Sequence, residues 1–95
     1  MNKRLEIKEI EKIAKALGDP YRLRIMEAIN KQQECMQCSV IVDMFELAQS
    51  TVSHHIKQLV DADLLIAAKD GRNARYVVNK DIFSAYINFL SQFSQ

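Results

Sequence analysis

The side chains best suited to chemistry lie between residues 49 and 58. Within and just after this segment, Val52, Ile56, Leu59 and Val60 recur at the spacing of one apolar stripe of a helix. The remaining positions can form hydrogen bonds and carry no negative charge: Gln49, Ser50, Thr51, Ser53, His54, His55, Lys57 and Gln58. Such a face suits a helix that reads DNA base edges, and we expect the last three residues nearer the phosphates. The alternative is an ordinary solvated helix face.

A second group of polar side chains surrounds the Asp70-Gly71 dipeptide. Two apolar, β-prone runs flank this turn, which predicts a hairpin over residues 64–78. Four side chains near its tip and second strand could contact phosphates or a minor groove: Lys69, Arg72, Asn73 and Arg75. The same residues would also serve simply to keep a hairpin soluble.

A third candidate site is the pair Cys35 and Cys38, which are three residues apart. At the start of a helix this spacing would place both sulfurs on one face. Together they could bind arsenite or a soft metal ion completed by carboxylates or another subunit, or they could form a redox-active disulfide. Two thiolates alone do not complete a tetrahedral zinc site. The remaining alternative is that both residues simply pack and sense nothing.

Mostly helical elements must position these groups. Apolar stripes predict a helix that stops at Gly18, a second from Pro20 to about Asn30, and a third over residues 36–45. The third, a tight link and the polar helix form a predicted helix-turn-helix over residues 36–62. After the hairpin, Asn79 can cap a last helix.

The two terminal helices carry apolar faces that a domain of this size would not cover by itself. The last helix has a broad aromatic face, made by Ile82, Phe83, Tyr86, Phe89, Leu90 and Phe93. The first helix has a matching stripe. We therefore predict that residues 1–17 and 80–95 form the interface of a homodimer.

The composition fits a single globular domain over residues 1–95, with 48% hydrophobic and 26% charged residues. No apolar run approaches the length needed to cross a bilayer, so we expect no membrane partner and a cytoplasmic location. The net charge is only +1, but the five acidic residues between residues 32 and 64 all lie outside residues 47–60. A local positive face is therefore compatible with a nearly neutral chain.

The order α-α-α-α-β-β-α, with the hairpin as a wing, resembles the ArsR/SmtB family of winged helix-turn-helix repressors. The run ALGDPYRLRIM at residues 16–26 is similar to the family's second-helix motif, L-x-D-P-x-R-L-x-I-L. The run QSTVSHHIKQL at residues 49–59 is similar to its recognition helix, and residues 70–76 to its wing. The resemblance covers about residues 14–80. It implies a mostly α fold with a small β-hairpin that dimerises through its N- and C-terminal helices.

The chain departs from the family pattern at three places. The serine that usually caps the recognition helix is Ala48 here. The Cys-x-Cys pair of metal-sensing members falls on Gln37 and Ser39, so the cysteines of this chain differ in register and spacing. A second family metal site uses Asp and His on the last helix, but no histidine follows His55. The resemblance implies an inducer site in the third helix and leaves the inducer unspecified.

We predict a repressor that binds double-stranded DNA as a homodimer on a palindromic operator and is released by arsenite, a soft metal ion or an oxidant at the two cysteines. Two alternatives remain: a winged-helix regulator without metal or redox sensing, and a winged helix used for protein interaction. We do not expect an enzyme, because a Cys-x-x-Cys oxidoreductase centre requires a βαβ setting that the chain lacks.

Overall fold

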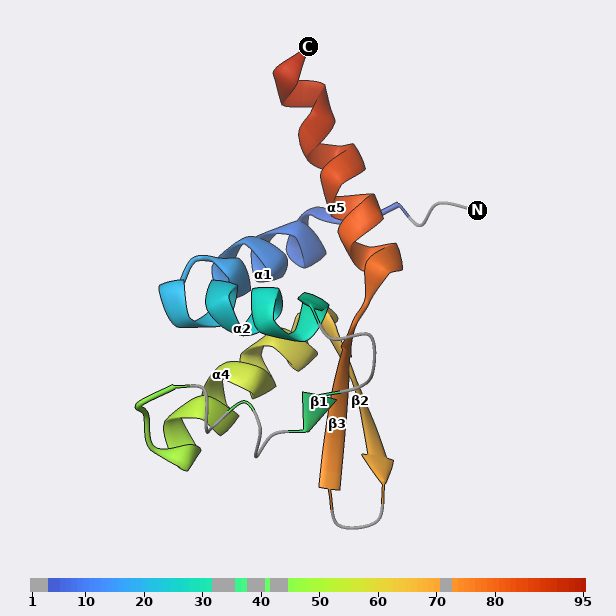
Figure 1. Cartoon of the computed structure of the whole chain (residues 1–95). Helices are drawn as coiled ribbons and strands as arrows, with labels where there is room; N and C mark the ends of the chain where they lie inside the picture. Colours follow the sequence, from blue (N-terminus) through green and yellow to red (C-terminus); the bar gives the residue numbers. More distant parts are fainter. Residues whose placement is uncertain (1–3, 32–35, 38–40, 42–44, 71–72) are drawn as a thin grey trace.

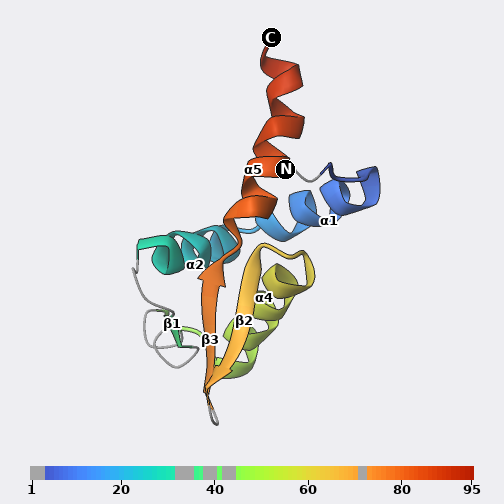
Figure 2. The same ribbon diagram turned by 90° about the vertical axis from the view of Figure 1, so that its right-hand side faces the viewer.

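The computed structural model describes residues 4–31, 36–37, 41, 45–70 and 73–95. Its elements, in chain order, are α1 (Ile7–Leu17), α2 (Pro20–Lys31), β1 (Met36–Gln37), α4 (Gln49–Asp61), β2 (Leu65–Asp70), β3 (Asn73–Val78), α5 (Lys80–Ser91) and the 3-10 helix η1 (Gln92–Ser94). Figure 1 shows α1, α2 and α4 gathered beside the β2–β3 hairpin, while α5 extends away from this body. Figure 2, turned by 90°, shows the same separation of α5 from the other helices and the hairpin. The predicted class, mostly α with a small hairpin, is confirmed.

Local hydrogen bonds define where the first two helices begin. The Glu6 amide donates to Oε1 of Glu9 at 3.1 Å, as part of a capping box at the start of α1. The Asp19 carboxylate accepts from the amides of Tyr21 at 2.8 Å and Arg22 at 3.1 Å, which caps α2 ahead of Pro20. These caps satisfy backbone donors that have no partner within their own helix.

Helix α4 ends in a Schellman motif that leads directly into the sheet. The Leu64 amide donates to the Leu59 carbonyl at 3.0 Å, and the Asp63 amide donates to the Val60 carbonyl at 2.9 Å. Asp63 has a φ of 61°, a left-handed conformation that Asp tolerates better than most residues. This turn fixes the angle between α4 and β2, which is the angle between the polar helix and the hairpin.

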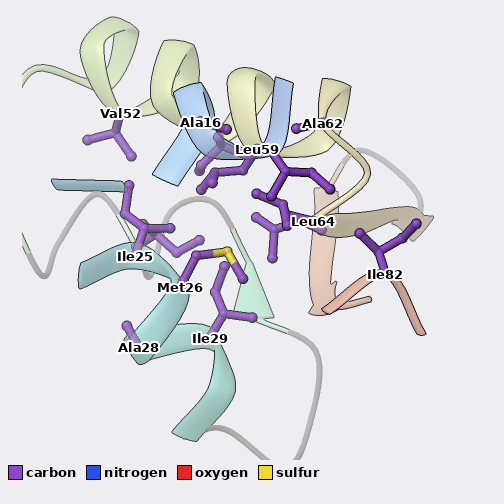
Figure 3. Close-up of a cluster of buried hydrophobic side chains, with 14 residues drawn as sticks. Ala16, Ile25, Met26, Ala28, Ile29, Val52, Leu59, Ala62, Leu64 and Ile82 are labelled. Carbon is purple, nitrogen blue, oxygen red and sulfur yellow. The ribbon is translucent and has the colours of Figure 1, made fainter. Parts of the chain in front are cut away.

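The core lies where α1, α2 and α4 meet the base of the hairpin. Figure 3 shows Ile25 and Met26 of α2 facing Val52 and Leu59 of α4. Fourteen residues form the buried cluster: Ile13, Ala16, Ile25, Met26, Ala28, Ile29, Ile41, Val52, Ile56, Leu59, Ala62, Leu64, Leu65 and Ile82. The apolar stripe of α4 is therefore its anchor, and its polar positions face outward.

The sheet has one strand more than the sequence predicted. Met36 and Gln37 form β1, which pairs antiparallel with β3 in the order β1-β3-β2. The predicted helix start at residue 36 is wrong, because these two residues are extended and make ladder contacts with Tyr76 and Arg75. Ile41 is helical and buried, while most of the predicted third helix lies outside the described residues.

Candidate nucleic-acid interface

Helix α4 presents one continuous polar face to solvent. Val52, Ile56 and Leu59 are buried beneath it. Seven of the eight predicted DNA-contacting residues of this helix are exposed, namely Gln49, Ser50, Thr51, Ser53, His54, Lys57 and Gln58. The first turn contains no acidic residue. A phosphate backbone would therefore meet no acidic side chain in the first turn of α4.

The start of α4 lacks a side-chain cap. Ala48 occupies the N-cap position with extended backbone angles, and no side chain accepts a hydrogen bond there. The Ala48 carbonyl accepts from the amides of Thr51 at 3.0 Å and Val52 at 3.1 Å. Amide groups at an uncapped helix start, combined with the positive end of the helix dipole, form a surface suited to an anion.

His55 differs from its neighbours on α4 because it is half-buried against α2. Its ring stacks on the Tyr21 ring, with centroids 6.0 Å apart and an interplanar angle of 24°. Its Nδ1 lies 3.4 Å from Nη1 of Arg22. The sequence predicted a residue near phosphates, whereas the structure shows that His55 also contacts another helix.

Lys57 forms an ion pair with Asp61 one helical turn away, at 3.1 Å. Both side chains are exposed, so the pair contributes only a few tenths of a kcal/mol by the usual range for such pairs. The Lys57 ammonium therefore remains accessible to a phosphate.

Three of the four predicted wing residues lie in the part of the hairpin that the structure describes. Lys69 lies opposite Ala74 in the β2–β3 register, and Asn73 begins β3 opposite Asp70. Arg75 is half-buried on the central strand, opposite Ala68 of β2 and Gln37 of β1. Arg72 lies outside the described residues.

The two cysteines also lie outside the described residues, but the segment between them does not. Because Met36 and Gln37 form a β-strand, the predicted helix does not begin at this segment. Among the residues that the structure describes, no group of three or more His, Cys, Asp or Glu side chains comes together as a metal site would require. Within that same part of the chain, no helix is long and apolar enough to cross a membrane.

Sequence reasoning did not identify Asp19 and Arg22 as part of this site. Burial raises the pKa of the Asp19 carboxyl, but hydrogen bonds from the backbone amides of Arg22 and Tyr21, with electrostatic interactions from the side chains of His55 and Arg22, outweigh burial, so that the pKa lies below its usual value. Because the folded-state pKa is depressed, the stabilisation is present at neutral pH and is lost as the pH falls through that value. The D-P-x-R run marked these residues as a motif, but not their proximity to α4.

A helix whose exposed face is polar and without acids from Gln49 to Gln58, standing beside a β-hairpin, is the arrangement of a winged helix-turn-helix protein. A family model described as a helix-turn-helix domain matches residues 17–66. The arsenical resistance operon repressor of Staphylococcus xylosus is 37% identical over 84 residues, which cover 88% of this chain and 78% of the relative. The chain belongs to the ArsR family of transcriptional repressors, which are regulators and not enzymes.

Solved structures agree with this fold. An ArsR-like transcriptional regulator from Rhodococcus sp. RHA1 superposes with a TM-score of 0.79 at 18% identity, covering 92% of this chain and 80% of that one. A homodimeric winged helix-turn-helix DNA-binding domain from Mycobacterium bovis gives a TM-score of 0.71 at 18% identity, with coverages of 90% and 81%. At these identities the likeness concerns the fold.

Proposed function

We propose that the protein represses transcription in the cytoplasm by placing α4 in the major groove of a palindromic operator. One observation carries the proposal: the exposed face of α4 is polar from Gln49 to Gln58 and contains no acidic residue. Amide, hydroxyl and imidazole groups are the side chains that discriminate base edges, at about 1–3 kcal/mol for a good bidentate pair.

The hairpin would contact the DNA backbone beside the recognition helix. Lys69, Arg72, Asn73 and Arg75 are the proposed contacts. Contacts of this kind add affinity for all sequences and make binding depend on salt concentration. The geometric support is the Schellman turn at Asp63, which holds β2 at a defined angle to α4.

The repressor would act as a homodimer through α1 and α5. Ile7 on α1, Ile87 and Leu90 on α5, and Phe93 in η1 are large apolar residues that remain exposed in the single chain. Figure 1 shows α5 extending beyond the body that contains the core. The homodimeric domain with the same fold supports this assembly. Two copies would place two α4 helices on the two half-sites of a palindrome.

Cys35 and Cys38 would receive the releasing signal, with arsenite, a soft metal ion or an oxidant as the candidate. Thiolates are the preferred ligands of soft ions. The strand between the two cysteines, β1, pairs with β3, and Gln37 lies opposite the wing residue Arg75. A ligand that draws the sulfurs together would therefore strain a strand that is hydrogen-bonded to the wing. The resemblance to an arsenical resistance repressor supports arsenite as the first ion to test.

The proposal is tested by selecting bound sequences from a random duplex library and measuring their affinity by fluorescence anisotropy. We expect an enriched palindrome and an affinity that falls steeply with salt. Failure to enrich any sequence, with binding that remains weak at low salt, would instead favour a winged helix for protein interaction.

The signal is tested on the selected duplex by adding arsenite, cadmium or an oxidant. The wild-type complex should dissociate with at least one of them, and the Cys35→Ser/Cys38→Ser variant should stay bound, because serine cannot supply a thiolate. Equal release of both proteins would exclude the cysteines as the sensor and leave the DNA-binding proposal intact.

A further inference from the structure

Arg22 connects three helices through a single guanidinium group. It belongs to the first turn of α2, and its Nε donates to the Ala16 carbonyl of α1 at 2.7 Å. Its Nη2 donates to the Lys15 carbonyl at 3.3 Å, and its Nη1 lies 3.4 Å from Nδ1 of His55 on α4. Each of the three nitrogens therefore has a separate partner. A cation at the carboxyl end of α1 is also favoured by the helix dipole.

In the contact between Arg22 and His55, only Arg22 can be the hydrogen-bond donor. A guanidinium carries donors and no acceptor, and it does not lose its proton in proteins. Nδ1 of His55 must therefore be the acceptor, with its lone pair directed at Arg22. In a neutral imidazole the proton then resides on Nε2, which becomes a donor.

Other contacts hold the His55 ring in place. The Tyr21 ring stacks on it at 6.0 Å, and Tyr21 in turn meets the Phe45 ring edge-on at 6.3 Å. The Asp19 carboxylate accepts from the amides of Tyr21 and Arg22, which anchors both residues at the start of α2. Packing against Tyr21 thus orients the His55 ring, and the contact with Arg22 selects its tautomer.

We infer that Arg22 is a positioning residue for DNA binding, which fixes His55 as the Nε2–H tautomer so that α4 offers a neutral N–H donor to a phosphate oxygen. The tautomer follows from contacts within the chain, whereas the contact with a phosphate rests on the proposed function. A histidine with the opposite tautomer would present a lone pair to an anion, which is unfavourable.

The tautomer is tested by long-range proton–nitrogen NMR of the imidazole groups at neutral pH. Wild-type protein should show His55 as the Nε2–H form. Arg22→Lys keeps the charge but cannot reach the same three acceptors, and it should give a mixture of tautomers while the protein is still folded. Arg24→Lys, on an exposed position of the same helix, should leave the spectrum unchanged. A dominant Nδ1–H form in the wild type, or no change in Arg22→Lys, would overturn the inference.

The role in binding is tested with two amide substitutions on the selected duplex. The Gln side chain in His55→Gln can place its N–H group near the position of Nε2, whereas the shorter side chain in His55→Asn reaches only the position of Nδ1. Loss of a hydrogen bond to a charged group corresponds to a decrease of at least about tenfold in affinity. We expect that decrease for His55→Asn and a change within about threefold for His55→Gln.

Equal losses in both variants would contradict the phosphate contact. If the wild-type protein binds no duplex at all, the proposed function fails, whereas the NMR experiment still decides whether Arg22 sets the His55 tautomer.

Discussion

Helices α4 and α5 have nearly the same length and the same kind of buried stripe, yet they expose opposite chemistry. α4 buries Val52, Ile56 and Leu59 and exposes amides, hydroxyls and imidazoles. α5 buries Ile82 and Ala85 and exposes Ile87, with 62% of its surface accessible, and Leu90. Burial of one face therefore accounts for both helices being folded, and the outward face decides what each can bind.

The amino-terminal ends of α4 and α5 also differ, both in their caps and in the charge of their first turns. α5 is capped by Asn79, whose Oδ1 accepts from the Ile82 amide at 3.4 Å, and it has Asp81 in its first turn. α4 has neither a side-chain cap nor an acidic residue in its first turn. The start of α4, which has neither a cap nor an acid, is therefore better suited to an anion than the start of α5. This difference supports the proposed nucleic-acid contact on α4 and the proposed dimer contact on α5.

The largest expected effect comes from giving α4 an acidic first turn. Ser50→Glu should decrease DNA affinity roughly a hundredfold, about 3 kcal/mol, because in the proposed complex the carboxylate would face phosphates. The same change should preserve the fold, since an acid near a helix start is favourable. Anisotropy and thermal unfolding measure the two effects. Ser94→Glu, an exposed position near the end of the chain, is the control and should bind normally.

The next effect comes from placing a charge on the apolar face of α5. Leu90→Lys should weaken dimerisation by about 2 kcal/mol or more, because a leucine buried at an interface contributes about 1.5–3 kcal/mol. Analytical ultracentrifugation would show monomer at concentrations where the wild type is a dimer. Affinity for an isolated half-site should not change. A variant that remains fully dimeric would show that α5 is not the interface.

Exchanging the caps of the two helices tests the difference at their starts. Ala48→Ser should raise the free energy of unfolding by about 1 kcal/mol, and Asn79→Ala should lower it by about 1 kcal/mol. Urea titrations measure both changes. If Ala48→Ser gives no gain in stability, the amides at the start of α4 already have adequate partners in the free protein.

The smallest effect concerns the ion pair on α4. Asp61→Asn removes the partner of Lys57, and because both side chains are exposed the stability should change by no more than about 0.5 kcal/mol. DNA affinity should rise slightly and become more dependent on salt, since an acid has been removed beside the site. A decrease in affinity would mean that Asp61 itself orients Lys57 on the DNA.

Sequence patterns predicted the helices and the hairpin because their signals are local. The stripe through Val52 and Ile56 repeats at helical spacing, and the turn at Asp70 lies between two β-prone runs. The strand at Met36–Gln37 could not be predicted in this way, because two residues have no period. That strand exists only through its pairing with β3.

The amino-acid sequence by itself determined which face of α4 is polar and that residues 49–58 contain no acidic side chain. It also determined that the last helix has an aromatic face. These properties follow from side-chain type and helical spacing. The tertiary structure decided that Arg22 meets His55, which is 33 residues away in the chain, and that the segment between Cys35 and Cys38 joins the sheet. Both contacts depend on how the helices pack over a shared core, and no local pattern encodes that arrangement.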